Sequence, residues 1–68
     1  MSNVAKVIEL VGKSENSWED AAANAVKAAA RTLHDITGVE VMSMTAKVQD
    51  GKIVEYKTTV KIAFAVAS

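Results

Sequence analysis

A turn signal, Asp50-Gly51, lies between two long stretches with the period-two pattern of β-strands, Val39 to Val48 and Ile53 to Val66. The tightest hairpin turns need positive φ angles at both central residues, and an Asp-Gly pair adopts these readily. Two strands joined by such a turn lie antiparallel. The sequence therefore predicts a β-hairpin, and every other segment has to be arranged around it.

The alternation assigns the residues of the hairpin to two faces. In the later strand, the predicted core face carries Val54, Tyr56, Thr58, Val60, Ile62, Phe64 and Val66. In the earlier strand, the predicted core face carries Met42, Met44, Ala46 and Val48, and the opposite face carries Val39, Val41, Ser43, Thr45 and Lys47. Methionine fills irregular gaps, so Met42 and Met44 are expected to pack against a helix.

The N-terminal segment predicts another strand. Val4 to Val11 alternates in the same way, and Gly12 is expected to end the strand. Ile8 and Leu10 lie on one side of this strand, and Val7 lies on the other.

A helix is predicted between this strand and the hairpin. Ser17 followed by Asp20 has the spacing of a capping box. Apolar residues then recur at helical spacing from Trp18 to Ile36, which makes the helix amphipathic. Gly38 is expected to supply the left-handed residue that ends it.

The order strand, helix, strand, strand places the fold in the α+β class. A helical crossover makes the first two strands parallel and leaves a gap between them. The last strand fits this gap and runs antiparallel to both neighbours. We predict a β-α-β-β fold in which a three-stranded antiparallel sheet, in the order 1-3-2, wraps on one amphipathic helix as a single domain over residues 1–68.

Association between copies is predicted from size and composition. A 68-residue chain buries a small share of its surface, and small folds usually compensate through disulfides, metals or oligomerisation. The chain has no cysteine and one histidine, while half of its residues are apolar. We therefore expect the sheet face opposite the core, which mixes valines with charged residues, to line a subunit interface.

The charge pattern argues against nucleic-acid and membrane partners. Eight basic and eight acidic residues cancel, and neither sign forms a run. No stretch approaches the roughly 20 apolar residues of a membrane span, and Met1 to Asn3 lacks the start of a secretion signal. We expect a cytoplasmic protein, and the lack of cysteine fits a reducing compartment.

No catalytic or metal-binding constellation is predicted, and we expect no enzyme. Gly12-Lys13-Ser14 has part of a phosphate-loop pattern, but Val7 occupies the position of its other required glycine. His34 has no second histidine or cysteine with which to share a transition metal, and it is the one histidine available to activate a serine. Trp18 is interpreted as a lid on the core, with shelter for a flat ligand as the alternative.

Several segments, taken in their order and spacing, resemble the dodecin family. They are Val7-Ile8-Glu9-Leu10-Val11-Gly12-Lys13-Ser14, Ser17-Trp18-Glu19-Asp20-Ala21-Ala22, Val39-Glu40-Val41, Asp50-Gly51 and Thr59-Val60-Lys61-Ile62-Ala63-Phe64. The resemblance covers nearly the whole chain and implies the fold predicted above. It also implies a hollow homododecamer. Typical members of the family bind flavins in pairs, store or sequester them, and are not known as enzymes.

The resemblance also indicates candidate ligand-binding residues. Family members stack the flavin ring on a tryptophan after the helix, hydrogen-bond it through a glutamine in the last strand, and often carry an arginine in the second strand. These positions fall on Gly38, Lys57 and Thr45 of this chain.

Two functions remain open. In one, the cage binds a flavin (riboflavin, FMN or FAD) or a related anionic aromatic ligand, and Lys57 offers a cation to its phosphate. In the other, the assembly is free of flavin and has a structural or metal-binding role. Carboxylates such as Glu9, Glu40 and Glu55, contributed by several copies, would then bind a hard cation such as calcium.

Overall fold

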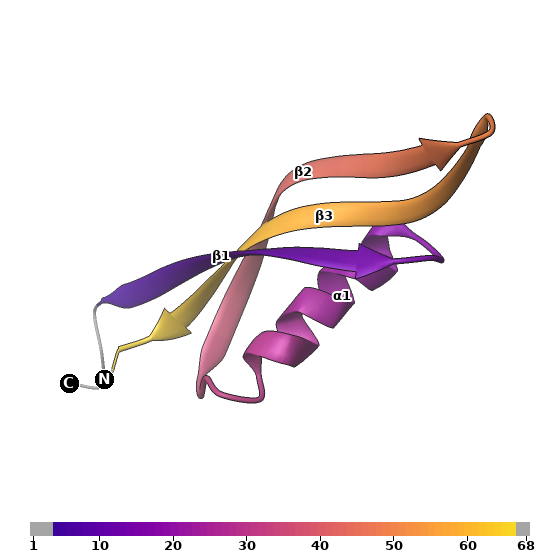
Figure 1. Ribbon diagram of the computed structural model, residues 1–68. Coiled ribbons are helices and arrows are strands. Elements are labelled where there is room, and N and C mark those ends of the chain that lie inside the picture. The colour runs from indigo at the N-terminus through magenta and orange to yellow at the C-terminus, as the bar shows by residue number, and fades with distance from the viewer. Residues whose placement is uncertain (1–3, 67–68) are drawn as a thin grey trace.

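The computed structural model describes residues 4–66, which form one helix and three strands. In chain order these are β1 (Ala5–Ser14), α1 (Trp18–Ala29), β2 (Ile36–Gln49) and β3 (Lys52–Ala65). β3 is the central strand and pairs antiparallel with both β1 and β2. Figure 1 shows α1 lying across one face of this sheet, while the hairpin of β2 and β3 extends past the helix as an arm. The predicted α+β class and the strand order 1-3-2 are confirmed.

The hairpin turn forms at the predicted position. Asp50 has a φ of 52° and Gly51 a φ of 75°, the positive values that this kind of turn requires. β2 and β3 pair from this turn to the other end of the sheet, where Ile36 lies opposite Phe64. The turn thus starts the hairpin, and the register between β2 and β3 shifts at three points beyond it, the first between Lys47 and Val48.

The core lies between α1 and the side of β1 and β3 that faces it. Val60 and Ile62 of β3 are fully buried, and Ile8 and Leu10 of β1 pack against the same cluster. The buried face of α1 consists of alanines, Ala21, Ala25 and Ala29. Because alanine has no side chain beyond Cβ, the helix backbone approaches the sheet closely. The predicted core face of β3 is confirmed at Val60 and Ile62, but it does not extend to Val54 or Val66, which are exposed.

β1 does not end at Gly12, as the sequence led us to expect, but continues to Ser14. Gly12 is buried and pairs with Thr58 of β3, so it is a regular member of the sheet. A Cβ on Gly12 would collide with the carbonyl oxygen of Ala21. Glycine is required here because α1 crosses β1 at close range, and it does not break the strand.

α1 begins where the capping pattern predicts. Ser17 is the N-cap, and its Oγ accepts a hydrogen bond from the N–H of Asp20 at 2.9 Å. In a capping box the N–H of the N-cap residue donates to the side chain three residues later, but here the N–H of Ser17 donates to the Oγ of Ser14 at 3.4 Å. The Ser14 hydroxyl in turn donates to the Asp20 carboxylate at 2.6 Å. Ser14 therefore joins the end of β1 to the first turn of α1.

α1 is shorter than predicted, because it ends at Ala29 with Ala30 as its C-cap. Leu33 and Ile36 continue the helical spacing of apolar residues and pack against the core. They do so, however, from the following loop and from the first residue of β2. No helix within residues 4–66 combines the length and the apolar character that a membrane crossing needs.

Gly38 is not the helix stop, because it lies inside β2. The left-handed residue between α1 and β2 is Asp35, with a φ of 60°. Its carbonyl oxygen accepts a hydrogen bond from the N–H of Ala65 at 3.1 Å, which ties this loop to the end of β3. The chain therefore reverses direction before Gly38, and Gly38 is a residue of β2 that lies opposite Ala63.

Strict alternation fails in β2 because the strand carries an extra residue. The register with β3 shifts between Val41 and Ser43, as at a β-bulge in which Met42 is the additional residue. Val39 lies opposite the buried Ile62, and directly opposed residues of an antiparallel pair share a face. Val39 and Val41 therefore belong to the helix side of the sheet, and their predicted placement on the other face is wrong.

The helix side of β2 is left uncovered within one chain. Met44 and Ala46 lie on this side as predicted, but α1 packs chiefly against β1 and β3. Met42 is 44% exposed and Met44 is 60% exposed. The prediction that these methionines pack under the helix is therefore wrong for the isolated chain.

Replacing Gly12 by alanine should destabilise the fold severely. The added Cβ collides with a backbone atom, which no side-chain rotation relieves, so we expect Gly12→Ala to lower the free energy of unfolding by about 3 kcal/mol or to prevent folding. Gly38→Ala is the matched control, since a Cβ there meets no atom within 4 Å. Urea denaturation followed by Trp18 fluorescence measures both variants. Equal stabilities would contradict the close crossing of α1 over β1.

Candidate ligand-binding site

The sheet face turned away from α1, called the outer face below, carries the candidate ligand residues. By register its members are Val7, Glu9, Val11 and Lys13 of β1, Glu55, Lys57, Thr59, Lys61 and Ala63 of β3, and Gly38, Glu40, Ser43, Thr45 and Lys47 of β2. A β3 residue in the middle of the face has one neighbour in β1 and one in β2. The face is therefore organised in rows that run across the three strands.

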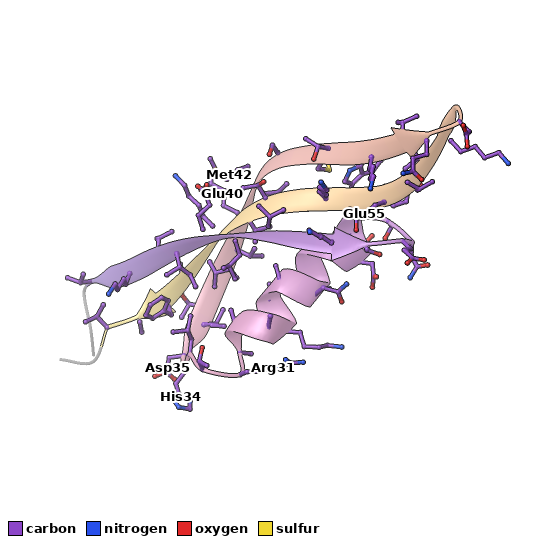
Figure 2. The ribbon with its side chains drawn as sticks, in the orientation of Figure 1. Arg31, His34, Asp35, Glu40, Met42 and Glu55 are labelled. Carbon is purple, nitrogen blue, oxygen red and sulfur yellow. The ribbon has the colours of Figure 1, made fainter. Side chains whose placement is uncertain are left out.

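An open hollow of about 410 Å³ lies at one end of the outer face. Its lining residues are Val7, Gly38, Glu40, Lys61 and Ala63 of the outer face, together with Val39, which follows Gly38 in β2 and belongs to the helix side. The space beside Gly38 is open, because a Cβ on this residue would meet no atom within 4 Å. Figure 2 shows Glu40 projecting from the bend of β2, next to Met42. A flat ring therefore has room beside Gly38, where the family resemblance places a stacking tryptophan.

One row of the hollow combines opposite charges. Lys61 lies between Glu9 of β1 and Glu40 of β2, and opposite charges across neighbouring strands stabilise a sheet modestly. The next row, which contains Ala63 and Gly38, is uncharged. The hollow thus offers an apolar floor with one charged edge, and the two carboxylates give that edge a net negative charge.

Thr45 and Lys57, the other two candidates, lie directly opposite each other on the outer face. On its other side Lys57 faces Lys13 of β1. Lys13 was not predicted to lie on the outer face, because the strand was expected to end at Gly12. Continuing the alternation through the glycine would have placed this lysine on the outer face.

Gly38 lies far from the Thr45 and Lys57 pair within one chain. It is opposite Ala63, which is six residues along β3 from Lys57, or about 20 Å at roughly 3.4 Å per residue. One ring system cannot touch both Gly38 and Lys57 of the same chain. A ligand that contacts both has to lie between two copies, and the ligand-binding roles of the three residues stay predictions.

Trp18 fastens the start of α1 to the hairpin. Its Nε1–H donates a hydrogen bond to the carbonyl oxygen of Thr45 at 2.7 Å, and its ring meets Tyr56 edge to face with centroids 4.8 Å apart. The hydroxyl of the buried Thr58 donates to the Trp18 carbonyl oxygen at 2.8 Å. Trp18 thus packs against the hairpin, outside the core cluster on which it was predicted to be a lid, and its contacts hold the backbone of Thr45 in place beside Lys57.

Metal-binding groups are dispersed in the part of the chain that the structure describes. Residues 4–66 contain no cluster of three or more histidine, aspartate or glutamate side chains that could hold a metal ion. Glu9 and Glu40 flank Lys61, whereas Glu55 lies elsewhere on the outer face. His34 is exposed in the loop after α1, as Figure 2 shows. A cation bound by these carboxylates would need oxygen ligands from several copies.

Comparison with known proteins gives a consistent result. The family model described as Dodecin matches residues 4–67. A relative named calcium dodecin, from Mycobacterium tuberculosis, is 34% identical over 62 residues, which are 91% of this chain and 87% of the relative. The solved dodecin of Streptomyces coelicolor superposes with a TM-score of 0.93 at 30% identity, covering 100% of this chain and 99% of that one.

The name of a second similar solved structure includes calcium. It is the calcium-chelating immunodominant antigen, calcium dodecin, of Mycobacterium tuberculosis, described as having a novel calcium-binding site. It superposes with a TM-score of 0.82 at 36% identity, covering 96% of this chain and 93% of that one.

The Trp18 anchor should contribute measurably to stability. Trp18→Phe keeps an aromatic ring but removes the donor to the Thr45 carbonyl oxygen, so we expect the free energy of unfolding to fall by about 1 kcal/mol. Trp18→Ala, which also removes the ring beside Tyr56, should cost about 3 kcal/mol or more. Urea denaturation followed by circular dichroism measures both variants, since neither retains a tryptophan. A phenylalanine variant as stable as the parent would show that this hydrogen bond is unimportant.

Proposed function

The chain belongs to the dodecin family, and on this premise we propose that it is the subunit of a homododecameric cage that binds a flavin or a related small anionic aromatic ligand. In this proposal each copy is a single domain, the cage works in the cytoplasm, and it stores or sequesters its ligand without catalysing a reaction. The hollow beside Gly38 on the outer face is the observation that carries the binding role.

Self-association is supported by apolar surface that α1 leaves uncovered. Several large side chains of the hairpin are about half exposed or more, namely Val39, Val41, Met44, Val48 and Ile53. Val39, Val41 and Met44 lie on the helix side of the sheet, beside a helix that packs chiefly against the other strands. Such a continuous apolar area is unusual on a monomer, and a chain of this size gains much of its stability by burying it against another copy.

The geometry of the outer face supports a site shared between copies. The hollow beside Gly38 offers an apolar surface for a ring, and the pair of Thr45 and Lys57 offers a hydroxyl and an ammonium group. These groups are too far apart to act together in one chain, but symmetric assembly places different parts of the same face next to each other. Without an aromatic partner at Gly38, the ring is held by shape and charge rather than by stacking.

Restoring the family residues should strengthen flavin binding. We expect Gly38→Trp combined with Lys57→Gln to bind riboflavin about tenfold more tightly than the parent protein, because an aromatic stacking contact contributes roughly 0.5 to 1.5 kcal/mol beyond area burial. Flavin fluorescence quenching measures the affinity for riboflavin, FMN and FAD. Lys27→Gln, which changes an exposed lysine of α1, is the control and should match the parent. A double variant that gains no affinity would show that these positions do not form a flavin site.

Calcium is the second candidate ligand. It is favoured by the similarity to the calcium dodecin of Mycobacterium tuberculosis, in sequence and in structure, and by the placement of Glu9 and Glu40 on one face. Calcium takes six to eight oxygen ligands, so the proposed ion lies where carboxylates of several copies meet.

Removal of calcium should destabilise the assembly if this second role holds. We expect calcium to raise the melting temperature by a few degrees, a chelator to reverse the change, and Glu40→Gln to abolish it. Magnesium is the control ion, because it demands a smaller and more regular octahedral site. A melting temperature that does not respond to calcium would leave flavin as the remaining candidate ligand.

A further inference from the structure

Two lysines face each other on the outer face, at the end away from the hollow. Lys13 of β1 and Lys57 of β3 are direct register partners, so their Cβ atoms lie about 5 Å apart, and like charges in this arrangement destabilise a sheet. The third residue of the row is Thr45, which is uncharged. Lys57 is half-buried in the middle of the face, while Lys13 is exposed.

The neighbouring rows do not neutralise this pair. Toward the hairpin turn, Glu55 lies on the same face, but its register partner is Lys47. In the other direction the next row contains the hydroxyl groups of Ser43 and Thr59. These rows together hold the three lysines Lys13, Lys47 and Lys57 against the single carboxylate of Glu55, with hydroxyls at Ser43, Thr45 and Thr59.

We infer that this part of the outer face is an oxyanion site that takes the phosphate groups of a ligand. Lysine ammonium groups bind phosphate as point charges, and hydroxyls of serine and threonine add neutral donors. A doubly charged phosphate between Lys13 and Lys57 turns their mutual repulsion into attraction. The inference rests on the proposed binding role and identifies the charged portion of the ligand, so phosphorylated ligands bind more tightly than their unphosphorylated forms.

Inorganic pyrophosphate tests the site directly. We expect saturable binding to the assembled full-length protein by calorimetry, with an affinity that falls as the salt concentration rises. Lys13→Gln and Lys57→Gln should each weaken it about tenfold, which corresponds to the loss of one charge-assisted contact. Lys27→Gln on α1 is the matched control and should bind like the parent. Binding that is absent, or unaffected by both substitutions on the sheet, would overturn the inference.

Thermal melting separates a binding role from a structural one. Without ligand, Lys13→Gln should raise the melting temperature, because it removes the repulsion from Lys57. With pyrophosphate, the same variant should gain less stability than the parent. A variant that is less stable without ligand would show that Lys13 supports the fold, contrary to the inference.

Comparison of riboflavin, FMN and pyrophosphate separates this inference from the proposed function. If FMN binds more tightly than riboflavin and Lys57→Gln removes this preference, both the flavin role and the oxyanion site are supported. The site is then assigned to the phosphate of the flavin. Binding of pyrophosphate but of neither flavin supports the oxyanion site for another phosphate source and contradicts the flavin role. If the protein binds riboflavin but does not bind pyrophosphate, the oxyanion site is overturned and the flavin role stays intact.

Discussion

The close crossing of α1 over β1 at Gly12 is the contact on which the rest of the structure depends. Gly12 lets the backbone of α1 approach the strand, and the alanine face of the helix fits chiefly over β1 and β3. A helix so narrow and so close to two strands leaves β2 and the arm of the hairpin uncovered (Figure 1). The exposed valines and methionines of that arm favour association, and the outer face carries the candidate ligand residues.

The outer face divides into two regions of different chemistry along β3. At one end Gly38 lines an open hollow beside the row of Glu9, Lys61 and Glu40. About 20 Å away, Lys57 belongs to a row that is rich in lysine and hydroxyl groups. A ligand with a flat ring and a charged group matches the two regions only when they come from different copies. The proposed binding role therefore requires assembly, because the two regions of one chain are too far apart to form a single site.

Much of the fold was predictable from local rules, whereas features that depend on contacts distant in sequence were not. Asp50-Gly51 and the Ser17 cap were read correctly because turn and cap chemistry is local. The sequence predicts a strand end at Gly12, because the real reason for a glycine there is the close crossing of α1, which is not visible in the local sequence. The bulge at Met42 reversed the predicted faces of Val39 and Val41, since one extra residue inverts an alternating pattern. Of the three candidate ligand residues, Thr45 and Lys57 lie opposite each other and Gly38 lies apart from them, which the sequence could not show because it depends on the register of the strands.

The mass of the particle in solution tests the central claim most directly, because both the stability of this small fold and the completeness of its site depend on association. Light scattering on the purified protein at micromolar concentration is sufficient. The account predicts a single species of twelve chains of 7.2 kDa each, about 86 kDa in total. A folded, stable monomer of 7.2 kDa would contradict it, because the exposed surface of the hairpin would then need no partner and the separated parts of the outer face would never meet.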